Sequence, residues 1–261
     1  MTKLTCLILI FISLLNVNAL IFDRWRVIKP QCRVWDKIAA EMKTAFGGKS
    51  CNALATSAIR LSFHDAGTHN QCGSDGSIMI FPVELENANN LQFAKITSFL
   101  RSIQNKYPTE GFADIIQFAG ILATVLCPGG PKIKFVAGRA DATEANDASL
   151  LPGLFDTSEK LLKDFDRMGF TPTDLVALLG AHSCGRGTDF IFLPFDQTEN
   201  KIDSRFYAEV LDEDGPRPGT QRLPSDENVS KDPVTHGTWV KFSQRPLAFK
   251  AAYRVKKKKY L

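Results

Sequence analysis

Apolar residues recur at helical spacing along most of the chain, whereas strand-like alternation is rare and short. In the first such segment, Val34, Ile38 and Met42 share one stripe of an amphipathic helix. The same periodicity predicts helices over residues 34–46, 51–64, 91–107, 112–127 and 171 to about 185. The segment 112–127 is apolar nearly all round, which is typical of a central buried helix.

Proline and cap residues predict where these helices begin and end. Pro108 stops the third helix, and the sequence Cys-Pro-Gly-Gly-Pro at 127–131 ends the fourth. Thr171 followed by Pro172 is a helix start, with the threonine as cap. The pattern predicts an all-α protein with long loops and a boundary near residue 158, between two lobes that carry one histidine each.

Composition narrows the class of protein. The chain has 261 residues, of which 44% are hydrophobic, enough for a sizeable core in one or two lobes. Its net charge of +4 depends on a basic end, with Arg254 and Lys256 to Lys259. Because no aromatic-basic interleaving accompanies this tail, a solvated end is favoured over a nucleic-acid interface.

The first 19 residues predict a secretory signal peptide. Lys3 supplies the basic start, residues 7–15 the apolar stretch and Val17-Asn18-Ala19 a small-residue cleavage site. The apolar stretch is short for a membrane span, and no other long one exists. We therefore expect a secreted protein without a membrane span.

Secretion makes disulfides and glycosylation plausible. Five cysteines, an odd number, remain once Cys6 leaves with the signal, so at least one does not pair within the chain. Asn228-Val-Ser230 is an N-glycosylation acceptor sequence.

The segment around His64 carries the first candidate chemistry. Arg60, Phe63 and His64 lie at positions i, i+3 and i+4, so one helix face presents all three side chains. A neutral histidine can transfer protons, and an adjacent arginine can stabilise developing negative charge. The alternative for His64 alone is a structural histidine near the surface, with Arg60 in an ion pair.

Together with their neighbours, these residues resemble a known family. The sequence Arg60-x-x-Phe63-His64-Asp65 is similar to the distal motif of the plant–fungal–bacterial haem peroxidase superfamily, and phenylalanine at position 63 resembles its secreted fungal members. The resemblance covers about residues 31–245. It implies a two-lobed helical fold around haem b, with a distal lobe over 20–158 and a proximal lobe over 159–261.

The resemblance also implies roles for individual residues. His64 would move the peroxide proton, Arg60 would stabilise charge, and Glu84 and Asn90 would hold the other ring nitrogen of His64, although Asn87 and Asn89 crowd the same stretch. His182, at the end of an apolar helix, would ligate the iron. Phe195 would lie beside it, and Pro152 would lie in a loop near the haem edge.

Two calcium sites follow from the same resemblance. The distal set would be Asp65, Gly73, Asp75 and Ser77, and the proximal set Ser183, Asp196, Thr198, Lys201 and Asp203. All offer the hard oxygen ligands that calcium prefers. By composition alone the distal segment is a turn, and the alternative for the proximal segment is an acidic surface loop. The resemblance further implies a Cys51–Cys127 disulfide and leaves Cys32, Cys72 and Cys184 unassigned.

One departure from the family is expected at the C-terminus. An aspartate that accepts the proximal histidine's N–H should fall near Lys250 or Ala252, yet the segment 249–255 contains no carboxylate. Without that partner, we expect a less basic His182 and slower peroxide cleavage.

The implied function is a monomeric enzyme that reduces hydrogen peroxide and oxidises small phenolic or aromatic donors. Ala53, Ser57 and Thr188 stand where manganese-oxidising members need carboxylates, and Ala177 stands where others carry a surface tryptophan. The missing carboxylate favours an alternative hypothesis, in which the protein is a catalytically impaired haem- or calcium-binding protein. A metal-dependent hydrolase using His64, Asp65 and His182 lacks the expected ligand spacing.

Overall fold

A computed structural model of the chain describes residues 32–68, 73–187 and 192–259, and these residues form an all-α protein. An isolated antiparallel bridge joins Arg186 and Pro194. The expected signal peptide, Cys72 and Thr188 lie outside the described residues. No helix in the described ranges is both long enough and apolar enough to cross a membrane.

The N-terminal helices are α1 (Arg33–Ala45), η2 (Gly48–Ser50), α2 (Ala53–Thr68), α3 (Ser77–Ile80), α4 (Pro82–Leu85), η3 (Ala88–Phe93), α5 (Ala94–Lys106) and α6 (Phe112–Leu126), where η denotes a 3-10 turn. Helix α6 is at the centre of this group, since α1, α2 and α5 all pack against it. Its burial on nearly every side confirms the expectation from its sequence.

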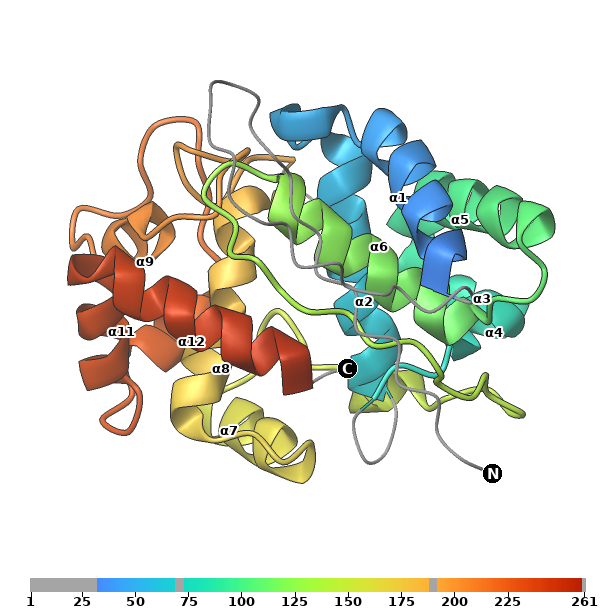
Figure 1. The fold of residues 1–261 in the computed structure, drawn as a ribbon. Coiled ribbons are helices and arrows are strands. Elements are labelled where there is room, and N and C mark those ends of the chain that lie inside the picture. Colours follow the sequence, from blue (N-terminus) through green and yellow to red (C-terminus); the bar gives the residue numbers. More distant parts are fainter. Residues whose placement is uncertain (1–31, 69–72, 188–191, 260–261) are drawn as a thin grey trace, which may run out of the picture.

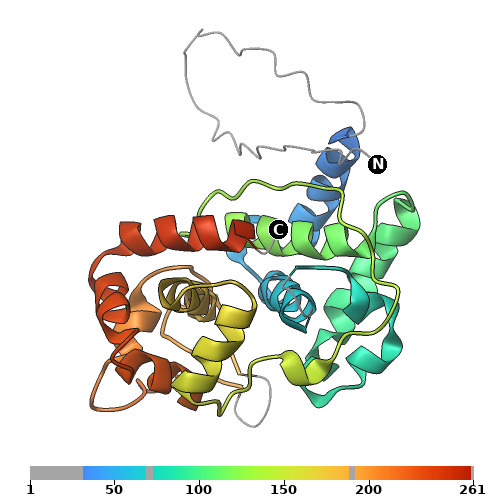
Figure 2. The ribbon, with the colours of Figure 1, turned by 90° about the horizontal axis from the view of Figure 1, so that it is seen from below.

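The C-terminal helices are η4 (Ala148–Leu150), α7 (Ser158–Arg167), α8 (Pro172–Leu179), η5 (Gly180–Cys184), α9 (Arg205–Val210), α10 (Pro224–Lys231), α11 (His236–Gln244) and α12 (Pro246–Lys259). Helix α12 packs across α8, and α11 packs on α9. Helices α2 and α8 run alongside each other at the middle of the molecule (Figures 1 and 2).

Each group of helices has its own aromatic core. In the N-terminal group, Trp35 contacts Phe118 and Phe135 with ring centroids 4.9 and 4.7 Å apart. In the C-terminal group, Tyr207 contacts Trp239 at 5.2 Å and Phe249 at 5.1 Å. Edge-to-face aromatic packing of this kind stabilises each core beyond the burial of its area.

The two helices that lead to the candidate histidines begin at side-chain caps. Asn52 Oδ1 accepts a hydrogen bond from Ala55 N at 3.1 Å at the start of α2. At the start of α8, Thr171 and Asp174 form a capping box, which confirms the predicted helix start. The predicted helix to about residue 185 ends earlier, because the chain tightens into η5 from Gly180 onward.

A disulfide joins Cys51, before α2, to Cys127, after α6, as the family resemblance implied. Cys32 is also disulfide-bonded. Cys184 is a buried thiol that belongs to neither bridge. Asn228, the glycosylation acceptor, is exposed on α10, and its amide donates to the Asp156 carbonyl at 3.0 Å.

Candidate active site

One face of α2 presents the predicted distal residues within a single turn. His64 is buried, with 5% of its surface exposed, whereas Arg60 and Phe63 are half-buried. Phe63 stacks on Phe165 of α7 with ring centroids 6.4 Å apart. The helix therefore holds His64 in the interior and leaves its two neighbours at the edge of the same surface.

Both ring nitrogens of His64 have defined partners. Asn90 Oδ1 lies 2.8 Å from His64 Nδ1, and an amide oxygen only accepts, so Nδ1 carries the hydrogen. Nε2 then accepts from Arg60 Nε at 3.2 Å. Of the three asparagines in this stretch, Asn90 is the one that reaches the histidine. Its own amide group donates to the Glu84 backbone carbonyl at 2.8 Å, which fixes the orientation of the oxygen.

The surroundings of His64 keep the ring neutral. Burial, aided by the positive charge of Arg60, lowers the pKa of His64 to about 3, against a smaller opposing effect of the Asn90 hydrogen bond. A neutral histidine with a defined tautomer can accept a proton at Nε2 from a molecule bound next to it.

Glu84 contributes to this arrangement in two ways. Its backbone, not its carboxylate, holds Asn90, while the carboxylate oxygens accept from Ser77 Oγ at 3.2 Å and from Asn146 N at 2.9 Å. Asn146 was not predicted, yet its side-chain amide donates to both Asp75 oxygens at 3.1 Å and to Ser77 Oγ at 2.8 Å. No sequence signal marks Asn146, which lies in a loop far along the chain.

The second histidine has a carboxylate partner, contrary to the prediction from the C-terminal segment. His182 Nδ1 lies 2.9 Å from Asp226 Oδ2, and the Asp226 side chain is 1% exposed. Asp226 lies in the first turn of α10, whose start is held by a hydrogen bond from Ser225 N to the Leu154 carbonyl at 3.0 Å. The segment around Lys250 instead forms α12 and packs on α8.

The other side of the His182 ring remains available. Phe195 and Phe206 contact it with ring centroids 5.1 and 5.6 Å away, and 30% of the side chain is exposed. Nε2 makes no hydrogen bond to any residue that the structure describes. Since the Nδ1 hydrogen points to Asp226, Nε2 carries the lone pair that a metal ion requires. The histidine therefore fits the role of an iron ligand.

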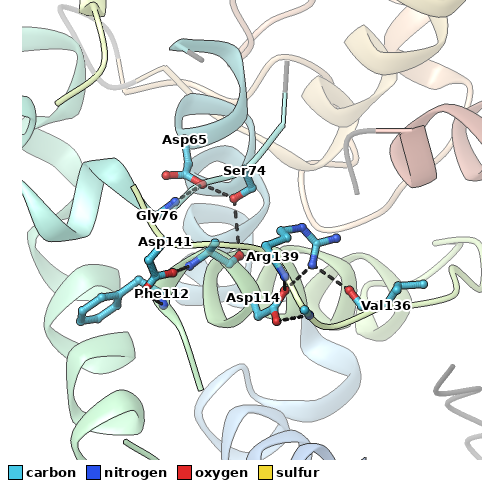
Figure 3. Close-up of polar contacts among 10 residues, drawn as sticks. Asp65, Ser74, Gly76, Phe112, Asp114, Val136, Arg139 and Asp141 are labelled. Carbon is cyan, nitrogen blue, oxygen red and sulfur yellow. Dashed lines mark hydrogen bonds and ion pairs between the residues drawn. The ribbon is translucent and has the colours of Figure 1, made fainter. Parts of the chain in front are cut away.

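Of the distal oxygen ligands predicted for calcium, Asp65 lies near the end of α2, with Ser74 and Gly76 beside it (Figure 3). Asp65 is buried; one carboxylate oxygen accepts from Ser74 Oγ and from Gly76 N, and the other has no partner among the described residues. Burial raises the pKa of Asp65 to about 7, with further contributions from the charges of Asp75 and Glu84. Gly73 and Asp75 lie in the loop before α3, and Ser77 is the first residue of α3.

This loop is connected to the start of α6, as Figure 3 shows. Asp141 accepts from Phe112 N at 3.0 Å and Ala113 N at 2.9 Å, capping the helix. Gly76 has φ of +75° and approaches Ala113 so closely that a Cβ would lie 2.6 Å from its backbone nitrogen. Close packing here requires glycine at position 76.

A buried ion pair between Asp114 and Arg139 also holds the first turn of α6. Asp114 accepts from the Arg139 guanidinium at 2.5 Å and from Gly138 N at 2.5 Å, and Arg139 also donates to the Val136 carbonyl at 2.7 Å (Figure 3). Arg139 is therefore held in a structural network.

The proximal oxygen ligands also lie together, directly beside η5. Ser183 Oγ donates to the Lys201 carbonyl at 3.1 Å and accepts from Asp203 N at 3.2 Å. Thr198 Oγ1 donates to Asp196 Oδ1 at 3.0 Å and to Asp203 Oδ1 at 3.3 Å. The five residues predicted from the resemblance thus form one contiguous hydrogen-bonded cluster.

Electrostatics shows why a cation fits there. Burial raises the pKa of Asp196 to about 7, and the negative charges of Asp203 and Glu209 raise it further. Asp196 Oδ2 and Glu209 Oε2 are buried oxygens without hydrogen-bond partners in the described ranges. Buried carboxylates in such a cluster are costly unless protonated or neutralised by a cation. Glu209, on α9, was not predicted as part of this environment.

Comparison with known proteins identifies the family. The peroxidase family model matches residues 34–245. The chain belongs to the peroxidase family. This assignment agrees with the all-α fold and with the pair of histidines on α2 and η5.

Three relatives illustrate the range of similar peroxidases. L-ascorbate peroxidase 5, peroxisomal, of Arabidopsis thaliana is 33% identical over 232 residues, which cover 86% of this chain and 80% of the relative. Ligninase LG6 of Phanerodontia chrysosporium is 32% identical, covering 81% of this chain and 64% of the relative. Manganese peroxidase 2 of Phlebia radiata is 33% identical, covering 78% and 61%. The chain thus spans less than two thirds of the length of these two fungal peroxidases.

Proposed function

We propose that this peroxidase uses haem b to reduce hydrogen peroxide and oxidise small phenolic or other aromatic donors in one-electron steps. The observation that carries the proposal is the matched pair of histidine contacts, His64 with Asn90 and His182 with Asp226. Haem would supply the iron at which peroxide binds and the electrons that cleave its O–O bond. Calcium would occupy the distal and proximal oxygen clusters.

The distal residues would move the proton and stabilise the charge. His64 Nε2 would accept the proton from peroxide and return it to the departing oxygen. Arg60, whose Nε lies 3.2 Å from that nitrogen, would stabilise the negative charge that develops as the bond breaks. Asn90 would keep Nε2 in the accepting state by holding the hydrogen on Nδ1.

The proximal residues would hold the iron. His182 would ligate it through Nε2, and Asp226 would accept the Nδ1 hydrogen, orienting the ring and making it more electron-rich. Phe195 would pack beside the ligand. The calcium cluster next to Ser183 would fix the segment that carries His182.

Donor choice rests on which surface residues are present. We infer that small aromatic molecules react at the haem edge, near Pro152. Leu151, the preceding residue, packs close to Gly67 at the end of α2. Oxidation of manganese is disfavoured because Ala53 and Ser57 offer no carboxylates. A surface tryptophan route is disfavoured because Ala177 is buried in α8.

We further propose that the protein is a secreted monomer. The N-terminal sequence and the Cys51–Cys127 disulfide support secretion, since disulfides persist outside the cytosol. The name of the Arabidopsis thaliana relative places that protein in peroxisomes, so fractionation of cells and medium is the direct check. The alternative of a catalytically impaired protein loses its main argument, because Asp226 supplies the carboxylate that the C-terminal segment lacks.

Rapid mixing of the haem- and calcium-loaded protein with hydrogen peroxide tests the proposal. The visible haem spectrum should change after mixing with peroxide, and the starting spectrum should recover when a phenolic donor is added. A spectrum that does not respond, or that only bleaches, would support the impaired alternative. Failure to bind haem at all would contradict both.

A further inference from the structure

Three cysteine sulfurs meet in the interior, and the disulfide joins two of them. The Sγ atoms of Cys51, Cys127 and Cys184 all lie within 4.8 Å of one another, and all three residues are buried. Cys51 and Cys127 form the disulfide, and Cys184 is a thiol. A thiol next to a disulfide is the arrangement from which thiol–disulfide exchange starts.

The three cysteines come from segments with different roles. Cys51 precedes α2, which carries His64; Cys127 follows α6; and Cys184 ends η5, two residues after His182. The sulfur cluster therefore connects the distal helix to the segment of the proximal histidine through the end of the central helix.

We propose that Cys184 is an exchange thiol for the Cys51–Cys127 disulfide, and that its sulfur attacks Cys127 and displaces Cys51. A Cys127–Cys184 bond forms as the Cys51–Cys127 bond breaks. The proton leaves the Cys184 thiol and the displaced Cys51 sulfur takes one up. One disulfide and one thiol are present before and after, so the step needs no oxidant or reductant.

Backbone geometry favours Cys51 as the leaving residue. Among the described residues other than glycine, Cys51 alone has a positive φ, +50°, a region that side chains with a Cβ occupy at a cost. Release from the disulfide would let this residue relax.

Cys127, in contrast, is already connected to the proximal side. The Pro128 carbonyl, one residue on, accepts a hydrogen bond from Ile202 N at 2.9 Å. Ile202 lies in the same loop as Lys201, whose carbonyl accepts from Ser183 beside Cys184. A Cys127–Cys184 bond would therefore join two segments that this loop already holds together.

The positions of the three sulfurs also imply that exchange requires a movement of η5. Exchange passes through three sulfur atoms in a nearly straight line. A non-bonded sulfur in van der Waals contact with a disulfide, and within 4.8 Å of both its atoms, lies off that line. The η5 segment has to shift before Cys184 can attack. The rate of exchange should therefore increase as η5 becomes less tightly held. In the product, Cys51 at the start of α2 is no longer in a disulfide, whereas the segment that carries His182 is bonded to Cys127.

Disulfide mapping of the intact protein tests this inference. The protein is incubated without added thiol in increasing guanidinium concentrations below its unfolding transition. Samples are then unfolded at acidic pH, where exchange stops, alkylated there with a maleimide, and digested for mass spectrometry. We expect the maleimide label to move from Cys184 to Cys51 and a Cys127–Cys184 peptide to appear, at a rate independent of protein concentration.

The variants C184S and C184A provide the controls. In both, label on Cys51 should stay at least about tenfold lower than in the wild-type protein, because no attacking sulfur is present. Label that remains on Cys184 up to the unfolding transition would overturn the inference. So would a Cys51–Cys184 peptide in place of Cys127–Cys184, or a rate that rises with protein concentration, which would indicate exchange between molecules.

Discussion

The two candidate histidines differ in the kind of group that holds Nδ1. His64 is bonded to a neutral amide, is almost fully buried and lies beside a positive charge, whereas His182 is bonded to a carboxylate and keeps 30% of its side chain exposed. In each case the Nδ1 partner leaves Nε2 as the acceptor. The amide and the arginine favour a ring that stays neutral and passes protons on, while the carboxylate favours a ring that donates electron density.

Removal of the distal histidine should have the largest effect. His64→Ala is expected to lower the rate of reaction with hydrogen peroxide by about 10²- to 10⁴-fold, because proton transfer at Nε2 is lost. Stopped-flow kinetics measures this rate. His236→Ala is the matched control, since His236 is exposed on α11 and should leave the rate unchanged. Equal rates for the two variants would contradict the role of His64.

Substitution of the residue that holds Nδ1 of each histidine tests the comparison directly. Asp226→Asn keeps the shape but removes the charge, and should lower the peroxide rate or haem retention about 10- to 100-fold. Asn90→Asp places a charge next to His64 and should raise its pKa from about 3, moving the acid limb of the pH–rate profile toward neutral pH. An unchanged acid limb in Asn90→Asp would show that the amide does not set the state of His64.

Much of this comparison could be predicted from the sequence because it depends on local spacing. Arg60 and His64 lie one turn apart on a helix, and the helix periodicity is strong. Asn90 was identified by its spacing from Glu84, but the structure shows that Glu84 acts through its backbone carbonyl, a group that no sequence pattern distinguishes.

The remaining contacts depend on tertiary packing. Asp226 lies 44 residues beyond His182 in the chain, whereas the carboxylate was expected in the segment that forms α12. The motif Leu-Pro-Ser-Asp at 223–226 carried the signal, since Pro224 begins a helix and places Asp226 in its first turn. Asn146 lies in an aperiodic loop, and neither pattern nor spacing relates it to Asp75.

Stability and calcium affinity should both depend on pH, because each oxygen cluster contains a carboxyl group with a raised pKa. The pKa of Asp65 and of Asp196 is about 7 in the folded protein against 3.8 for the ordinary value. Without calcium, the stability contributed by these groups is fully present below the unfolded value and is lost as pH rises through about 7. Calcium needs the ionised groups, so its affinity should fall by up to about tenfold per pH unit and per site below pH 7.

Calorimetry with and without a calcium chelator measures this effect. The difference in Tm between the two states should grow from about pH 5 to about pH 8, and the difference cancels contributions common to both states, including that of His64. Asp196→Asn should remove the proximal part of the proton release on calcium binding while leaving the distal part. Calcium binding without proton release at pH 6 would contradict the raised pKa values.

Removal of the side-chain caps of α2 and α8 should have the smallest effects, and it compares the stability of the distal and proximal helices. Thr171→Ala removes the hydroxyl that accepts from Asp174 N, and should lower the free energy of unfolding by about 1 kcal/mol, whereas Thr171→Ser keeps the hydroxyl and should be nearly neutral. Asn52→Ala should cost more, because the Asn52 amide also donates to the Ala45 carbonyl at 2.9 Å. Urea unfolding measures both, and equal midpoints for Thr171→Ala and Asn52→Ala would mean that this second hydrogen bond adds no net stability to the distal side.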